Sequence, residues 1–164
     1  MDKLKQVQQV QQHEAELGKF FTSKYEELQK SAFVDKVEEV PNRRGVYVIY
    51  DKDKNPIYVG RTNKLKSRLI MHTLEYSSGN SATFAFGLAK KEYEKKHGRI
   101  EKKRAELERD EDFQNFFAEQ KKYLREQCSY KVLLVENDVL QTMLEPYLAY
   151  KLGTYPELNT FENR

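Results

Sequence analysis

Apolar side chains in the first part of the chain recur at helical spacing. Val7, Val10, Leu17 and Phe21 are separated by three, seven and four positions, so they fall near one side of an α-helix. The same segment contains a single glycine and no proline, which leaves the helical pattern uninterrupted. We therefore expect one or two helices here, and we assign residues 1–40 to an N-terminal helical extension.

A β-hairpin is predicted directly after this extension. Residues 45–50 read GVYVIY, a run of β-branched and aromatic side chains that is typical of a strand. DKDKNP, at 51–56, predicts a turn because Asp, Asn and Pro favour leaving regular structure. IYVG at 57–60 then indicates a second short strand that returns antiparallel to the first.

The next segment has the pattern of a short helix. Residues 65–76 follow two candidate N-cap residues, Thr62 and Asn63, either of which could accept a hydrogen bond from the first turn. Arg68 and His72 are four positions apart, so they share one face of this helix.

Residues 84–127 are mostly charged and helical in pattern, and we expect them to form a helical insertion. Within them, residues 95–112 are almost entirely polar, which predicts an arm that projects into solvent and supplies little core. A third strand is predicted at 130–135 (YKVLLV), followed by a last helix that Asp138 caps and that ends near Gly153.

These patterns predict an α+β fold. It consists of a small three-stranded antiparallel sheet flanked by helices, with N-terminal helices and a helical insertion at about 84–127. We assign residues 41–164 to the main domain.

Composition narrows the class of protein only slightly. The single cysteine cannot form an internal disulfide, and no apolar run resembles a signal peptide or a membrane span, so a cytoplasmic location with no membrane role is expected. The net charge of +3, from 29 basic and 26 acidic residues, is too small to identify a nucleic-acid binder.

Charge is concentrated around the hairpin. Residues 42–72 contain eight basic and two acidic side chains, a local net charge of +6. Such a stretch favours a surface that contacts phosphates, although a basic, solvated surface with no ligand has the same composition. The residues predicted to bind nucleic acid are Arg43, Arg44, Arg61, Lys64 and Lys66.

Alternation along the first strand places Tyr47 on one face with Ile49, and Tyr58 lies in the returning strand, so two tyrosines can meet across the hairpin. Tyrosines in strands usually pack in the core with their hydroxyls at the rim. The pattern alone therefore does not assign them a function.

Four motifs together resemble the GIY-YIG nuclease family. GVY at 45–47 is similar to its first motif and YVG at 58–60 to its second, each with Val in place of Ile. RTNKLKSRLIMH at 61–72 is similar to the family's arginine and histidine helix, and LEPYLAYKLGTYPELN at 144–159 to its last helix and tail. The resemblance covers about residues 41–76 and 130–160.

The resemblance implies a metal-dependent endonuclease that hydrolyses DNA phosphodiester bonds, with a restriction or defence-like role. Glu145 would bind Mg²⁺ or Mn²⁺, and Arg68 would stabilise charge on the scissile phosphate. The other roles implied are water activation by Tyr47, orientation of water or phosphate by Tyr58 and proton relay by His72. Asn159 would fix the tail and Glu145 by hydrogen bonds.

One departure from the family pattern and two alternative functions stay open. Pro146 directly follows Glu145, and proline inside a helix removes a hydrogen bond and can kink the helix that carries the carboxylate.

A catalytically silent nucleic-acid-binding module on the same fold would show the same basic stretch. A helical interaction protein is the other alternative, since the Gln-rich start is compatible with a homodimer as well as with an ordinary capping helix.

Overall fold

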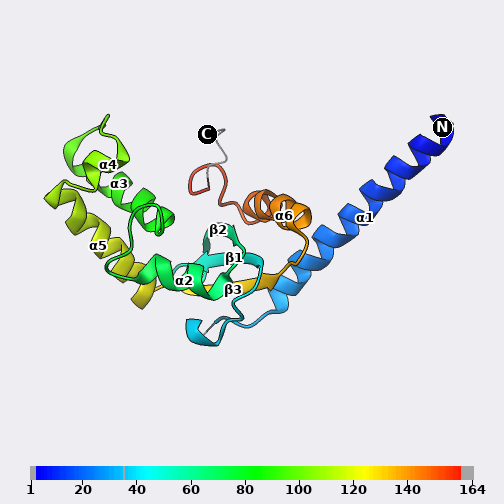
Figure 1. The fold of residues 1–164 in the computed structure, drawn as a ribbon, viewed down its shortest axis with the longest axis horizontal. Helices are drawn as coiled ribbons and strands as arrows, with labels where there is room; N and C mark the ends of the chain where they lie inside the picture. The colour runs from blue at the N-terminus through cyan, green and yellow to red at the C-terminus, as the bar shows by residue number, and fades with distance from the viewer. Residues whose placement is uncertain (1–2, 35, 160–164) are drawn as a thin grey trace.

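The computed structural model describes residues 3–34 and 36–159, and its centre is a three-stranded antiparallel sheet of order β2–β1–β3 (Figure 1). The strands are β1 (Gly45–Tyr50), β2 (Pro56–Thr62) and β3 (Ser129–Leu134). Tyr47 of β1 pairs with Gly60 on one side and with Val132 on the other. The predicted α+β fold with a small antiparallel sheet is confirmed.

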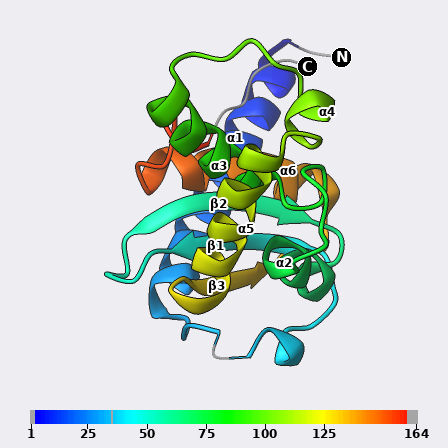
Figure 2. The ribbon, with the colours of Figure 1, turned by 90° about the vertical axis from the view of Figure 1, so that its left-hand side faces the viewer.

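Helices cover both faces of this sheet (Figure 2). One face carries α2, α3 and α5, and the other carries α6 and the last turns of α1 (Figure 1). The bounds are α1 (Lys3–Lys30), a 3₁₀ turn η1 (Val37–Glu39), α2 (Leu65–Thr73), α3 (Thr83–His97), α4 (Arg104–Leu107), α5 (Glu111–Glu126) and α6 (Asp138–Lys151).

The central strand β1 is buried along its whole length, and its side chains divide between two cores. Tyr47 and Ile49 pack with α2 and the insertion, as the predicted alternation requires. The opposite core, towards α6 and α1, takes Val46, Val48 and Tyr50. A sheet buried on both faces holds the Tyr47 ring in a fixed position between its neighbours.

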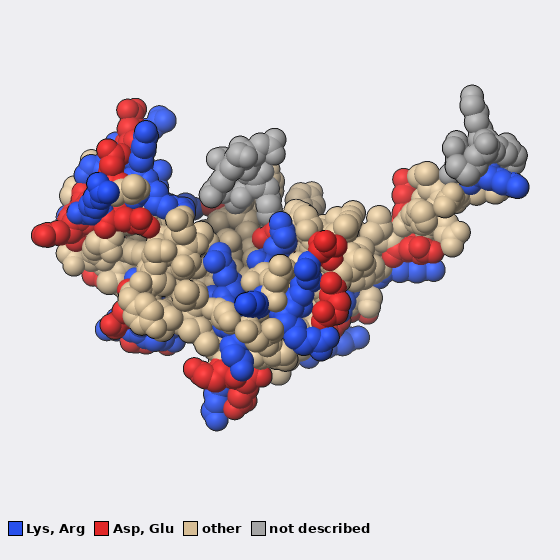
Figure 3. Space-filling model, viewed as in Figure 1, with Lys and Arg blue, Asp and Glu red and all other residues tan. Residues whose placement is uncertain are grey.

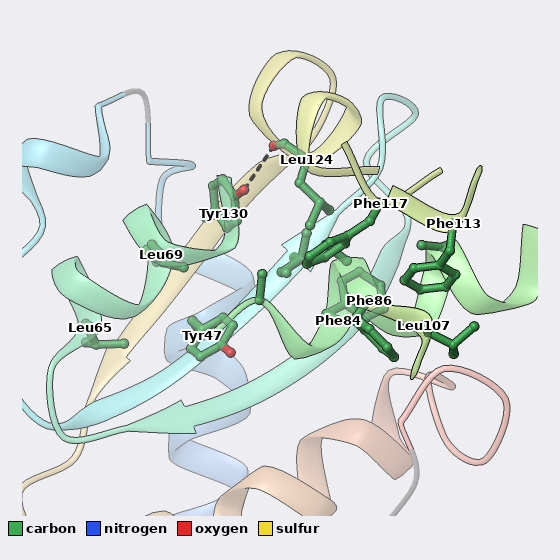
Figure 4. Close-up of a cluster of buried hydrophobic side chains, with 14 of the residues drawn as sticks. Tyr47, Leu65, Leu69, Phe84, Phe86, Leu107, Phe113, Phe117, Leu124 and Tyr130 are labelled. Carbon is green, nitrogen blue, oxygen red and sulfur yellow. Dashed lines mark hydrogen bonds between the residues drawn. The ribbon is translucent and has the colours of Figure 1, made fainter. Parts of the chain in front are cut away.

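The insertion contributes to the core through α3 and α5, whereas the segment 95–112 between them is mostly exposed, as predicted, and buries only Leu107. Phe84, Phe113 and Phe117 from α3 and α5 fill the space beside the sheet, and Leu107, inside the polar segment, is only 1% exposed (Figure 4). The segment 95–112 reads as polar because only a few of its side chains face inward. Leu107 is the buried one, and it packs in the core that α3 and α5 also line.

Two predicted helix caps were wrong by one or two positions. The N-cap of α2 is Lys64, and Thr62 instead accepts a hydrogen bond from the Lys64 amide at 3.1 Å. The N-cap of α6 is Asn137, whose side chain accepts from the Leu140 amide at 2.9 Å. Pro146 lies inside α6, which continues as one helix from Asp138 to Lys151.

The N-terminal extension is a single long helix whose first half stands away from the body of the protein (Figure 1). Val7 and Val10 are 53% and 56% exposed, whereas Leu28 is fully buried against the sheet. Lys131 of β3 holds the C-terminal end of α1 against the sheet by donating hydrogen bonds to the carbonyls of Leu28 and Gln29. The homodimer predicted through this extension stays a prediction.

The predicted domain division at residue 40 also stays a prediction, and residues 1–2, 35 and 160–164 of the two predicted domains lie outside the described residues. Within the described ranges, every helix is too short or too polar to cross a membrane.

Replacing Leu107 by alanine tests the revised view of the insertion. A buried leucine cut back to alanine should lower the free energy of unfolding by about 2–5 kcal/mol, measured by urea denaturation. Val139→Ala removes an apolar side chain that is 61% exposed and serves as the control with little effect. A cost at Leu107 as small as the cost at Val139 would show that Leu107 does not contribute to the core.

Candidate active site

Tyr47 and His72 form the buried centre of the candidate site. The Tyr47 hydroxyl shares a hydrogen bond with Nε2 of His72 at 2.8 Å, and the two side chains are 1% and 0% exposed. Arg68, one turn earlier on α2, points its Nε to the same hydroxyl at 3.5 Å. The predicted i, i+4 pair on α2 therefore meets the predicted strand tyrosine at one oxygen atom.

Burial controls the protonation of this pair. Loss of solvent raises the pKa of Tyr47 above its ordinary value, and the nearby Tyr58 raises it further, while Arg68 acts in the opposite direction. Burial and the charge of Arg68 lower the pKa of His72 to about 3. The imidazole is therefore neutral at physiological pH, with one nitrogen able to accept a proton.

Arg68 is held by the first residues of the insertion. Its Nη1 donates to the carbonyl of Ser81 at 2.9 Å, and its Nη2 donates to Oγ1 of Thr83 at 3.0 Å. Together with Tyr47, these partners orient the guanidinium from three sides. The sequence reasoning did not identify Ser81 or Thr83, because a polar loop of Ser, Gly, Asn and Thr carries no signal for a particular partner.

Glu145 reaches the same neighbourhood from α6. Its carboxylate accepts a hydrogen bond from Nε of Arg61 at 3.0 Å, and its side chain is 18% exposed. Burial raises the pKa of Glu145, and the positive charges of Arg61 and Arg68 oppose this rise. Glu145 in turn raises the pKa of Tyr47. The carboxylate thus lies within electrostatic reach of both Tyr47 and Arg68.

Tyr58 completes the aromatic part of the site. Its ring centroid lies 6.2 Å from that of Tyr47 and 6.3 Å from that of His72. Phe84 stacks on Tyr58 with the centroids 4.4 Å apart. Phe84 is a second residue that the sequence reasoning left in the insertion without a role, although it supports a predicted site residue.

Asn159 anchors the tail to the sheet. Its amide makes two hydrogen bonds to the backbone of Val59, at 2.9 and 2.7 Å, and it accepts a third from Oγ1 of Thr154 at 2.8 Å. The predicted role in fixing the tail therefore has a structural basis. The predicted hydrogen bond between Asn159 and Glu145 is absent from the contacts that both residues make.

Gly60, the glycine of the YVG motif, is required for a steric reason. A Cβ atom at Gly60 would overlap the Tyr47 ring, including its hydroxyl oxygen, on the neighbouring strand. Tyr47 therefore lies flat across this position of β2, and a larger residue would displace the hydroxyl from His72.

The predicted phosphate-binding residues lie around the site with different partners. Arg61 pairs with Glu145, and Arg43 pairs with Glu136 at 2.5 Å near the start of the hairpin. Lys64 is exposed, whereas Arg44 and Lys66 are half-buried. Figure 3 shows Lys and Arg side chains gathered over the middle of this face of the molecule.

The residues present fit a single hard cation. Within residues 3–34 and 36–159, no three His, Cys, Asp or Glu side chains come together as a preformed cage. Mg²⁺ and Mn²⁺ need only one or two carboxylates, since water and substrate oxygens fill their other positions. Glu145 is a partly exposed oxygen donor that lines an open groove with Tyr58 and Asn159, and it suits this kind of site.

Comparison with known protein families agrees with this geometry. Residues 43–115 match the family model described as the GIY-YIG catalytic domain. This segment contains both strands of the hairpin, α2 and α3, so the resemblance is confirmed for the motifs at 45–47, 58–60 and 61–72, while the motif at 144–159 lies outside the match. The match supports a nuclease-type domain in this part of the chain. No curated protein and no solved structure gave a significant match.

Gln141 is a further residue of this region that the sequence reasoning missed. It is fully buried on α6, one turn before Glu145, and its Nε2 donates to the carbonyls of Gly45 and Thr62 at 2.8 Å each. Gly45 and Thr62 pair with each other across β1 and β2. One amide thus joins the helix that carries Glu145 to the open end of the hairpin.

Replacing Gln141 by leucine should leave both carbonyls buried without a donor. We expect the free energy of unfolding to fall by about 1–3 kcal/mol, measured by urea denaturation. Thr142→Val, at the next and exposed position of α6, is the matched control. Equal stability of the two variants would show that the Gln141 bridge is dispensable.

His72 should give the protein a distinct acid sensitivity. Its pKa is about 3 when folded and near the ordinary 6.5 when unfolded, so the unfolded chain binds the extra proton between these values. The contribution of His72 to stability is therefore complete above pH 6.5 and decreases as the pH falls towards 3, by about 1.4 kcal/mol per pH unit. Denaturation curves of the wild type and His72→Gln, recorded from pH 7 downward at steps of about one unit, should differ by this slope. Parallel pH profiles would contradict the buried neutral imidazole.

Proposed function

We propose that the protein is a metal-dependent endonuclease that hydrolyses phosphodiester bonds in DNA. The observation that supports this most strongly is the Tyr47 hydroxyl, which His72 and Arg68 both contact, beside the carboxylate of Glu145. Hydrolysis of a phosphodiester needs an activated water, charge stabilisation at the phosphate and help for the leaving oxygen. These four side chains offer groups of the right chemistry for the first two.

Tyr47 is the proposed general base, with His72 as its proton acceptor. A tyrosine of ordinary pKa is ionised to about one part in a thousand at neutral pH, and burial makes ionisation of Tyr47 still harder. The phenol therefore needs a partner that takes its proton as it receives one from water. Nε2 of His72, at 2.8 Å, is such a partner. A phosphate bound beside Arg68 would raise the basicity of His72 by adding negative charge nearby.

Arg68 is the proposed stabiliser of the phosphate in the transition state. Its guanidinium is permanently charged and is already oriented by Ser81, Thr83 and Tyr47. A pre-oriented donor loses little free energy to reorganisation when charge develops on the phosphate oxygens. Tyr58, on the other side of Tyr47, would orient the water or the phosphate.

Glu145 is the proposed ligand of Mg²⁺ or Mn²⁺. When bound, the cation would neutralise phosphate oxygens and assist the departing oxygen. Arg61 holds the carboxylate in place through its hydrogen bond to Oε2. The exposed basic side chains around the hairpin, Lys64 among them, would bind the flanking DNA backbone.

Nicking of supercoiled plasmid DNA tests the proposal. With Mg²⁺ the wild type should produce open-circular DNA, and Glu145→Gln should reduce the rate by about 100-fold or more because the carboxylate ligand is lost. Glu136→Gln is the matched control, since Glu136 also pairs with an arginine but lies at an exposed position. It should nick at the wild-type rate.

The same assay separates the competing functions. Equal nicking by the wild type and Glu145→Gln would rule out the proposed metal site. DNA binding by a wild type that never nicks would favour the catalytically silent binding module. Discrete products from a linear DNA mixture would support a restriction or defence-like role, whereas a smear would argue against sequence recognition.

A further inference from the structure

An open groove leads away from the candidate active site towards the insertion. Its volume is about 690 Å³, and its lining includes Tyr58, Glu145 and Asn159 of the candidate site. Helix α3 and the segment around α4 line it further along, opposite the tail residues Glu157 and Leu158. The groove is therefore continuous with the site where the proposed chemistry takes place.

Lys91 and Arg104 in this groove are bound by neutral oxygens, and Lys90 has only a loose carboxylate partner, although Glu94, Glu145 and Glu157 also line the groove. Nζ of Lys91 donates to the backbone carbonyl of Glu157, and Nη1 of Arg104 donates to the amide oxygen of Asn80 at 2.6 Å. Lys90 lies 3.8 Å from Glu94, a loose and partly exposed pair. These cations are held in position mainly by neutral oxygens, which leaves them able to attract phosphate.

Gly87 leaves one wall of the groove without a side chain. It lies inside α3, is exposed and lines the groove, and a Cβ atom added there would have nothing within 4 Å. Glycine inside a helix costs about 0.5–1 kcal/mol relative to alanine. Packing within the protein does not require this cost, and the missing side chain would let a ligand backbone approach α3 closely.

We propose that this groove binds an unpaired DNA strand that continues from the scissile phosphate, with Lys90, Lys91 and Arg104 contacting its phosphates and Gly87 giving the strand room against α3. The groove has the volume of a small-ligand site, which admits a few nucleotides of one strand but excludes a duplex. This inference rests on the proposed nuclease function and adds a class of substrate to it, namely DNA with a single-stranded segment beside the cut.

Binding can be measured separately from cleavage in a Glu145→Gln background. The probes are a blunt fluorescent duplex and the same duplex with a single-stranded extension of about six nucleotides, at either end. The extension should tighten binding by about tenfold at low salt. Lys90→Ala combined with Arg104→Gln should remove this gain and lower the salt dependence by about 0.7 per lost phosphate contact.

Gly87→Ala gives the sharpest test, because it should affect stability and binding in opposite directions. The substitution should raise the melting temperature, since alanine is the better helix former, and should abolish the gain from the extension. Gly18→Ala is the matched control: Gly18 is also an exposed helical glycine with nothing within 4 Å of an added Cβ, but it lies in α1. It should raise the melting temperature without changing binding.

Lys95→Ala, which removes an exposed lysine of α3 that does not line the groove, should likewise leave binding unchanged. Equal affinity for blunt and extended probes, or full binding by Gly87→Ala, would overturn the groove proposal even if plasmid nicking succeeds. A gain from the extension in a protein whose wild type never cuts DNA would instead support the groove and reject the nuclease function.

Discussion

The hydrogen bond between Tyr47 and His72 is the interaction around which the rest of the site is arranged. Both groups are buried, and a buried hydroxyl or imidazole without a partner costs free energy comparable to that of a lost hydrogen bond. The pair can form only if α2 crosses the sheet with its fourth and eighth residues facing β1, which also brings Arg68 to the same oxygen. Gly60 leaves the space in which the phenol lies. One polar contact in an apolar layer thus determines the position of the hairpin, of α2 and of the guanidinium.

Helix α6, which carries Glu145, covers the opposite face of the sheet, so a separate contact is needed to bring the carboxylate towards this centre. Gln141 provides it by bridging the last pair of β1 and β2 residues from α6. The carboxylate then lies one helical turn further, beside Arg61 of the adjacent strand. Asn159 makes a similar attachment, because its side-chain amide forms hydrogen bonds with the backbone of Val59 in β2. Amide side chains therefore attach the C-terminal third of the protein to the edge and end of the hairpin.

Local periodicity made much of this predictable from the sequence. Alternation in β1 correctly separated Tyr47 from Val46 and Val48, and the four-residue spacing correctly placed Arg68 and His72 on one face of α2. Contacts between distant segments have no such local signature. The bonds from Arg68 to Ser81 and Thr83, the stacking of Phe84 on Tyr58 and the bridge from Gln141 depend on how the elements meet in space. The core between α3 and α5 was not identified for the same reason, because the sparse apolar residues of these helices become a core only when the two helices lie together.

Three positions of this region, His72, Gln141 and Gly87, lower the free energy of unfolding through an unpaired atom or an exposed helical glycine. Nδ1 of His72 and Oε1 of Gln141 are buried without hydrogen-bond partners, and among the side chains that the structure describes they are the two buried polar atoms in this condition. Each unpaired buried polar atom costs about 1–3 kcal/mol. Gly87 adds the cost of an exposed glycine within a helix. All three belong to elements that surround the Tyr47 hydroxyl or the groove beside it. Gly18 of α1 carries the same cost as Gly87, so only the unpaired atoms of His72 and Gln141 set this region apart. Both of those side chains also make the contacts that position the Tyr47 hydroxyl and the open end of the hairpin, so the cost at one atom accompanies a positioning bond at another.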